Sequence, residues 1–154
     1  MKIIKKQKFR AAILFKSNSD LIVKDIETEE FLDYGQVLIK LKYSSICGTQ
    51  IKEIDAIQGK DKYLPHLLGH EGVGTVEETG PGVKKVKKND IVILHWRKSS
   101  GIESTPPKYY YKNKLINAGY VTTFNEKAIV SENRLTKIHK KIDLKVAPLF
   151  GCSL

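Results

Sequence analysis

The sequence predicts a mainly β domain, a barrel or sandwich of short strands with one or two short helices. Two observations carry this prediction. Short apolar or alternating stretches follow one another closely, and turn-forming residues separate them. Only one segment in the body of the chain has apolar residues at helical spacing, and no internal repeat is present. Such a succession of short strands is typical of β-barrels and sandwiches.

The first third of the chain predicts three strands. They cover residues 9–15, 21–27 and 36–46, and the polar turn 16–20 separates the first two. In the third stretch, Val37, Ile39 and Leu41 alternate with polar or smaller residues. A period of two indicates a strand with one buried face.

A short helix is predicted over residues 49–57. Ile51, Ile54 and Ile57 recur there at a spacing of three, which places them on one side of a helix. The following residues up to Pro65 contain Gly and Pro and predict a turn that ends the helix.

The remaining chain predicts further strands joined by turns. The strands cover residues 72–80, 90–96 and 121–130, the last running on into 131–140. A turn rich in Gly, Pro, Asn and Asp precedes the second, and a long polar loop over 97–114, with a hairpin turn at 112–114, follows it. Residues 143–154 resemble the start of a helix that Pro148 and Gly151 interrupt.

Size and composition indicate one folded domain over residues 1–154. A hydrophobic fraction of 41% against 29% charged residues favours a packed core over disorder. The chain has no apolar run long enough for a membrane span, and its N-terminus lacks the pattern of a secretory leader. A cytoplasmic protein is therefore expected.

The formal net charge of +10 raises the question of an anionic partner. The lysines are scattered along the chain, and aromatic interleaving is confined to residues 109–111. A solvated lysine-rich surface is therefore favoured over nucleic-acid binding, and an attraction for anionic cofactors or substrates fits either interpretation.

Four histidines and two cysteines are the candidate zinc ligands. Cys47, His70 and Cys152 would form a set of three protein ligands, as catalytic zinc usually has. They lie far apart in sequence, so no local zinc-finger spacing is present. A satisfied buried histidine with two core thiols, or one disulfide, explains these residues about as well.

Three motifs add a resemblance to a known family. The stretches SSICGTQ (44–50), LPHLLGHEGVGTVEETGPGVKKVKKNDIVIL (64–94) and APLFGC (147–152) resemble, in order and spacing, the zinc-dependent medium-chain alcohol dehydrogenases. The resemblance runs from about Phe9 to Leu154. It implies a GroES-like, partly open β-barrel, the N-terminal catalytic domain of such enzymes.

The resemblance also implies roles for particular residues. The catalytic zinc ligands of the family match Cys47, His70 and Cys152. Thr49 matches the hydroxyl that passes on the alcohol proton, and Glu71 the acidic residue beside the ligand histidine. Trp96 stands about where the family places an aromatic residue in the substrate pocket.

The implied activity is oxidation of a small alcohol to a carbonyl compound. In the family it proceeds through a zinc-bound alkoxide, with hydride transfer to NAD(P). The nucleotide-binding half of such enzymes would begin just after Cys152, and no G-x-G-x-x-G fingerprint occurs in these residues. We therefore expect this chain alone to be inactive. An apolar surface is expected where the nucleotide-binding half would dock, and its exposure would allow this chain to form a homo-oligomer or to aggregate.

Two positions and one stretch depart from the family pattern. Gln50 stands where an aspartate is usual, and Lys52 near where some members have a histidine. The stretch after Trp96 has none of the four cysteines that hold a structural zinc in many members, so one catalytic zinc and no structural zinc is expected.

Two other interpretations compete with a dehydrogenase domain. A free-standing GroES-like binding or interaction module would need no catalytic zinc, and its affinity for nucleic acid would fall steeply with salt. A zinc-free reductase relative is the second, but it gives no reason for all three candidate ligands to be present.

Overall fold

The computed structural model describes residues 1–57, 59–139 and 141–153 of the chain. Residues 140 and 154, which end two of the predicted segments, and residue 58 in the predicted turn lie outside this description. The strands are β1 (Lys2–Ile3), β2 (Lys8–Leu14), β3 (Ile22–Thr28), β4 (Phe31–Leu32), β5 (Gln36–Ser44), β6 (His66–Leu67), β7 (Glu71–Thr79), β8 (Ile91–His95), β9 (Tyr109–Tyr111), β10 (Lys114–Ile116), β11 (Lys127–Ser131) and β12 (Leu135–Lys137). The helices are α1 (Gly48–Ile54) and the 3-10 turns η1 (Glu132–Arg134) and η2 (Ala147–Gly151).

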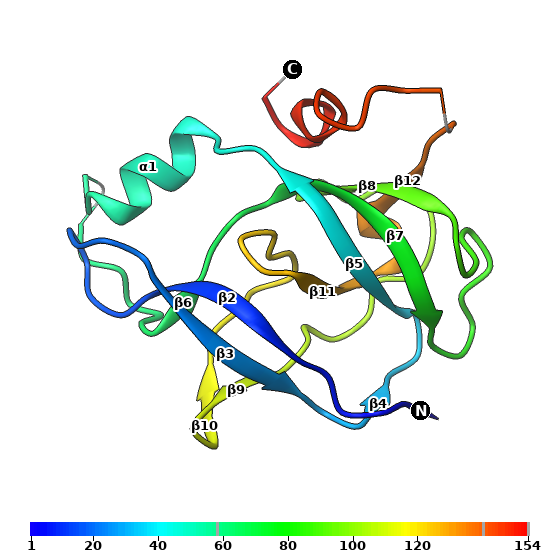
Figure 1. Cartoon of the computed structure of the whole chain (residues 1–154), viewed down its shortest axis with the longest axis horizontal. Coiled ribbons are helices and arrows are strands. Elements are labelled where there is room, and N and C mark those ends of the chain that lie inside the picture. The colour runs from blue at the N-terminus through cyan, green and yellow to red at the C-terminus, as the bar shows by residue number, and fades with distance from the viewer. Residues whose placement is uncertain (58, 140, 154) are drawn as a thin grey trace.

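The strands form two five-stranded sheets and one small pair (Figure 1). One sheet has the order β10-β9-β3-β2-β6, the other the order β11-β5-β7-β8-β12, and β1 pairs with β4. Every ladder between these strands is antiparallel. The prediction of a mainly β, partly open barrel with a few short helices is confirmed.

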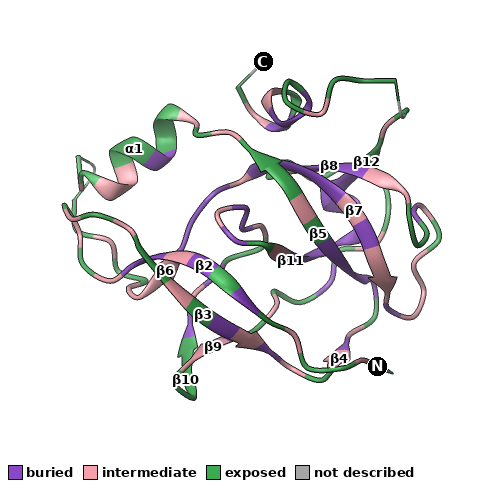
Figure 2. Ribbon diagram, viewed as in Figure 1, coloured by how far each residue is buried: buried purple, intermediate pink, exposed green. Residues whose placement is uncertain are grey.

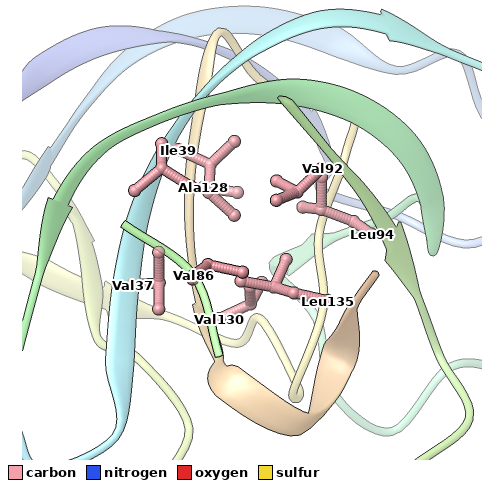
Figure 3. Close-up of a cluster of buried hydrophobic side chains, with 9 residues drawn as sticks. Val37, Ile39, Val86, Val92, Leu94, Ala128, Val130 and Leu135 are labelled. Carbon is pink, nitrogen blue, oxygen red and sulfur yellow. The ribbon is translucent and has the colours of Figure 1, made fainter. Parts of the chain in front are cut away.

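The largest core cluster lies inside the curled second sheet (Figure 3). Its buried members are Val37, Ile39, Val76, Val86, Val92, Leu94, Ala128, Val130 and Leu135. They come from β5, β7, β8, β11 and β12 and from the turn before β8, so one cluster ties all five strands together. Figure 2 shows this burial running along β7 and β8.

The alternation predicted for β5 holds only in part. Val37 and Ile39 face the main cluster, but Leu38 is also buried, in a second cluster with Leu32 and Ile129. The small β1–β4 pair supplies Leu32 and so covers the opposite face of β5 at this end. Toward its C-terminal end β5 becomes exposed, and Tyr43 is 44% accessible.

Helix α1 ends earlier than predicted. It stops at Ile54, and Ala56 follows with a left-handed φ of 53°. That conformation breaks the helical hydrogen-bond pattern before Ile57, which is 67% exposed. The apolar spacing alone overestimated the length of the helix.

The strand predicted over 121–130 was wrong in its first half, since β11 covers only Lys127–Ser131. The residues before β11 form separate backbone hydrogen bonds with different neighbours and do not form a β-ladder. The backbone N–H groups of Thr123 and Phe124 both donate to the carbonyl oxygen of Leu68, and the Phe124 carbonyl accepts from Ala12. This segment is therefore irregular, although Thr123 is buried.

Two other segments also differ from the prediction. The end of the predicted loop forms the β9–β10 hairpin, whose predicted turn is confirmed by positive φ angles at Lys112 and Asn113. The C-terminal segment forms the short 3-10 turn η2 in place of a longer helix.

No helix in the described parts of the chain is long and apolar enough to cross a membrane.

Candidate metal centre

Three distant segments bring the predicted ligands to one place, near the ends of β5 and β7 and the turn η2. Cys47 follows β5 and is the N-cap residue of α1. His70 immediately precedes β7, and Cys152 ends η2. One ligand atom of each residue lies within 4.8 Å of the other two, and the two Sγ atoms are 3.7 Å apart.

His70 has one ring nitrogen engaged and one without a partner. Its Nδ1 contacts the side-chain amide of the buried Gln50. Its Nε2 is buried and has no hydrogen-bond partner among the described residues. Burial lowers the pKa of His70, although the nearby Glu71 charge opposes this, so the imidazole is favoured in the neutral form that binds metals.

The Gln50 amide has two orientations with different consequences. With Nε2 toward His70, the Gln50 Oε1 is buried without a partner in the described structure. Rotating the amide by half a turn places Oε1 against Nδ1–H of His70 and leaves Nε2 of His70 with its lone pair free. Only this second arrangement prepares His70 as a metal ligand.

The two thiols are electrostatically unequal. The backbone N–H of Thr49 lowers the pKa of Cys47, and the thiol of Cys152 contributes further. Burial raises the pKa of Cys152, and its contact with Cys47 adds to the rise. A metal ion between them would bind both as thiolates, and the set of two sulfurs and one imidazole suits zinc. The residues present therefore fit a zinc ion.

Glu71 is fully buried, but its hydrogen bonds go to Ser153 and not to His70. One carboxylate oxygen accepts from the backbone N–H of Ser153 at 3.0 Å, and the Ser153 hydroxyl donates to both oxygens at 2.7 and 3.0 Å. Its side chain therefore fixes the residue that follows Cys152. Nothing in the local sequence around Ser153 indicates this contact, so Ser153 was not predicted as a site residue.

Thr49 and Trp96, the remaining predicted site residues, lie beside the cysteines. The Thr49 Oγ1 is 3.7 Å from the Cys47 Sγ. Thr49 and Lys52 both line a cavity of about 330 Å³. Trp96 follows β8, is 47% exposed, and contacts the Cys152 thiol through its side chain. Trp96 therefore lies at the edge of the candidate metal centre and not in the hydrophobic core.

Two glycines permit the close packing around the ligands. Gly69 precedes His70 with φ +89°, and a Cβ there would lie 2.4 Å from the Thr123 hydroxyl oxygen. A Cβ on Gly151 would lie 2.7 Å from both the Glu71 Cβ and the Leu94 carbonyl oxygen. Both positions therefore require glycine for the backbone to reach the site.

The other three histidines do not contribute to this centre. His95 is a satisfied structural residue, because its ring nitrogens contact the Arg97 carbonyl and the Thr136 hydroxyl. His139 is exposed. His66 is partly buried and contacts two carboxylates at a separate place.

A comparison with protein families matches residues 33–140 to the alcohol dehydrogenase GroES-like domain. The match covers most of the chain, including Cys47 and His70. The chain belongs to this family.

Two known dehydrogenases are similar to this chain in sequence. The D-arabinose 1-dehydrogenase (NADP(+)) of Saccharolobus solfataricus is 30% identical over 92% of this chain and 42% of that protein. An alcohol dehydrogenase of Geobacillus stearothermophilus is 36% identical over 56% of the chain and 26% of its own length.

Solved structures share the fold. An alcohol dehydrogenase zinc-binding domain protein from Burkholderia ambifaria has a TM-score of 0.83 at 20% identity, over 96% of this chain and 46% of that one. The benzyl alcohol dehydrogenase of Acinetobacter calcoaceticus has a TM-score of 0.77 at 22% identity, over 95% and 45%. The chain thus spans less than half the length of each of these four proteins.

Proposed function

We propose that residues 1–154 are the zinc-holding catalytic domain of an alcohol dehydrogenase that converts a small alcohol to a carbonyl compound. The observation that carries the proposal is the unpartnered, buried Nε2 of His70 beside the paired sulfurs of Cys47 and Cys152. A buried nitrogen without a partner is costly in free energy, and a metal ion at that position would remove the cost.

Cys47, His70 and Cys152 would hold the zinc ion. When bound, zinc acts as a Lewis acid that lowers the pKa of a hydroxyl group beside it. Gln50 holds His70 in the ligating tautomer by accepting its Nδ1–H. Glu71 holds the Cys152 segment in place through Ser153, because the two hydrogen-bonding groups of that residue converge on the carboxylate.

Thr49 would receive the proton that the alcohol loses. Its Oγ1 lies 3.7 Å from the Cys47 sulfur, and Thr49 lines the adjoining cavity, so a proton accepted there would pass toward solvent. Lys52 lines the same cavity in the place where some relatives have a histidine.

The hydride acceptor in this proposal is NAD(P), bound by a portion of the protein that these 154 residues do not include. The chain carries no G-x-G-x-x-G motif, and its described sheets contain no parallel βαβ unit. Trp96, exposed beside Cys152, would line the path of the substrate.

The proposed function requires a metal ion with one coordination position free for an alcohol, whereas a metal-free interaction module would have no such position. Cobalt(II) replaces zinc in such sites and absorbs visible light according to its ligands. Adding trifluoroethanol, an alcohol of lowered pKa, to the cobalt-loaded chain should shift the cobalt d–d spectrum saturably. An unchanged spectrum in a chain that has bound cobalt would contradict a site that accepts an alcohol.

A further inference from the structure

A second group of metal-ligating side chains lies apart from the Cys47–His70–Cys152 centre. Glu53 belongs to α1, Asp61 to the loop after it, and His66 to β6. The His66 Nδ1 is 2.8 Å from the Asp61 Oδ2 and 3.5 Å from the Glu53 Oε1. One ligand atom from each of the three residues lies within 4.8 Å of the other two.

The group is set into the fold and is not a loose surface cluster. The side chain of Asp61 is 3% exposed, that of His66 is 13% exposed, and Glu53 closes the outer side at 33%. The other oxygen of Asp61, Oδ1, accepts from the backbone N–H of Tyr63 at 2.7 Å. This bond holds the carboxylate so that Oδ2 faces the imidazole.

The distances between the ligand atoms of these three side chains are close to those around a bound metal ion. Ligand bonds of 2.0–2.2 Å in a tetrahedral site put neighbouring ligand atoms roughly 3.4 Å apart. The distance from His66 to Glu53 already has this value. The shorter distance to Asp61 is that of a hydrogen bond and would open by about 0.6 Å when a metal replaces the shared proton.

The charges also favour a cation at this place. Burial raises the pKa of Glu53; the nearby Asp61 charge adds to the rise, whereas His66 opposes it. When all three side chains bind a metal, the two carboxylates supply a charge of −2, which a divalent ion neutralises. Lys52, Lys60 and Lys62 line the adjoining cavity and act against a cation, but all three are exposed, so solvent and salt screen them.

We propose that Glu53, Asp61 and His66 form a second metal site that binds a divalent cation such as Mn²⁺ or Zn²⁺. One imidazole and two carboxylates without a thiolate suit these ions, and Mn²⁺ prefers oxygen ligands over sulfur. The cavity beside Thr49 has Glu53 and Asp61 in its wall, which gives the ion a path of entry. A bound ion would join α1 and the following loop to β6, and so stiffen one wall of that cavity.

Manganese binding to the full chain, followed by the EPR signal of free Mn²⁺, tests the proposal. The parent should bind one Mn²⁺ saturably. Glu53→Gln should weaken the affinity at least about tenfold, because it removes one of three ligands while keeping the shape. Glu53 makes no side-chain hydrogen bond among the described residues, so this variant should fold normally.

Three further variants complete the experiment. His66→Gln should abolish saturable binding, whereas Asp55→Asn, an exposed acid beside the same helix, should leave it unchanged. The double variant Cys47→Ser, Cys152→Ser should also bind Mn²⁺ like the parent, which separates this site from the thiolate centre. Equal affinities in the parent, Glu53→Gln and His66→Gln would overturn the proposal and leave the three side chains with a structural role only.

Discussion

Gln50 decides how His70 can act, because one side-chain amide controls the histidine tautomer. An aspartate at this position would accept Nδ1–H and also add a negative charge next to the ligand set. A glutamine accepts the same proton while remaining neutral. The metal would then retain more positive charge, which favours loss of a proton from a neighbouring hydroxyl group.

Replacing Gln50 by leucine should weaken zinc binding about 10- to 100-fold, since the partner of a ligating histidine is removed while the volume is kept. Competition with a chromophoric chelator measures this affinity. Gln7→Leu, a partly exposed glutamine on the other side of the barrel, is the control and should bind zinc like the parent. An undiminished affinity in Gln50→Leu would show that His70 needs no such partner.

The sequence predicted the candidate ligand residues through a resemblance in three motifs, but not the contacts that orient them. Cys47, His70 and Cys152 were identified because their neighbours form recognisable motifs. The bond from Ser153 to Glu71 joins residues that are far apart in sequence, so no local pattern reveals it. The orientation of Gln50 likewise depends on the burial that only the folded chain provides.

The 3-10 turn η2 is the element on which the geometry of the centre depends. It carries Cys152 at its end and packs where Gly151 meets both β7 and β8. The contacts of a Cβ at this position would be with the Glu71 Cβ and a backbone oxygen of Leu94, and neither can move aside at low cost. Any side chain there must displace the turn.

Gly151→Ala should therefore lower zinc affinity on the order of tenfold while the barrel stays folded, because Cys152 is displaced from the other ligands. Gly48→Ala provides a matched control, since a Cβ at Gly48 meets nothing within 4 Å. Zinc affinity and the far-UV circular dichroism of both variants give the answer. Equal affinities in the two variants would contradict the role of η2.

A buried carboxylate joins the turn before β8 to the loop between β8 and β9. Glu132, at the start of η1, accepts hydrogen bonds from the backbone N–H groups of Lys84, Lys85 and Ile102. Burial opposes its charge, but these N–H groups outweigh that effect and hold the pKa of Glu132 below its usual value. The carboxylate thus fixes a lobe that has no cysteines to hold it.

Glu132→Gln should reduce the free energy of unfolding by about 1–3 kcal/mol at pH 7, since an amide cannot replace all of these acceptors. Because folding lowers this pKa, the stabilising effect is present above the unfolded value of about 4.3 and is lost as the pH falls through the folded value. Urea unfolding at pH 7 and below pH 4 should show the difference between parent and variant shrinking. The exposed Glu30→Gln should differ little from the parent at either pH; a Glu132 difference that grows in acid would contradict this sign.

At the scale of elements, most of the longer strands were predictable, but the start of β11 was not. The ranges of β2, β3, β7 and β8 follow the apolar patterns closely. Residues 121–126 have the composition of a strand, yet their backbone hydrogen bonds go to separate partners on three different segments. Composition cannot show which neighbours a segment will find in the folded chain.

For the whole molecule, the mainly β class followed from the number and spacing of short strands. The pairing of distant segments did not, because β11 pairs with β5 and β12 pairs with β8, and each pairing joins residues more than about 40 positions apart in sequence. These long-range pairings join strands of the second sheet (Figure 1), and the folded chain brings Cys47, His70 and Cys152 together. The resemblance to a known family supplied that arrangement in advance.

The chain alone should not bind NADH saturably, because its described ladders are all antiparallel and it has no glycine fingerprint for a dinucleotide. Energy transfer from Trp96 to NADH, or calorimetry, measures this directly. No NADH formation from NAD⁺ and a primary alcohol is expected either. Saturable binding at micromolar NADH would contradict the assignment of the cofactor to another portion of the protein.

The central claim is that Cys47, His70 and Cys152 bind one metal ion together. Titrating the metal-free chain with cobalt(II) and recording the thiolate-to-cobalt charge-transfer absorption tests it most directly, because carboxylate sites do not give this band. If the three residues bind one ion together, the band should rise to a plateau at one equivalent of cobalt(II) in the parent. It should halve or vanish in Cys47→Ser and in Cys152→Ser and weaken in His70→Ala. A parent without the band, or a Cys152→Ser variant with the full band, would contradict the claim.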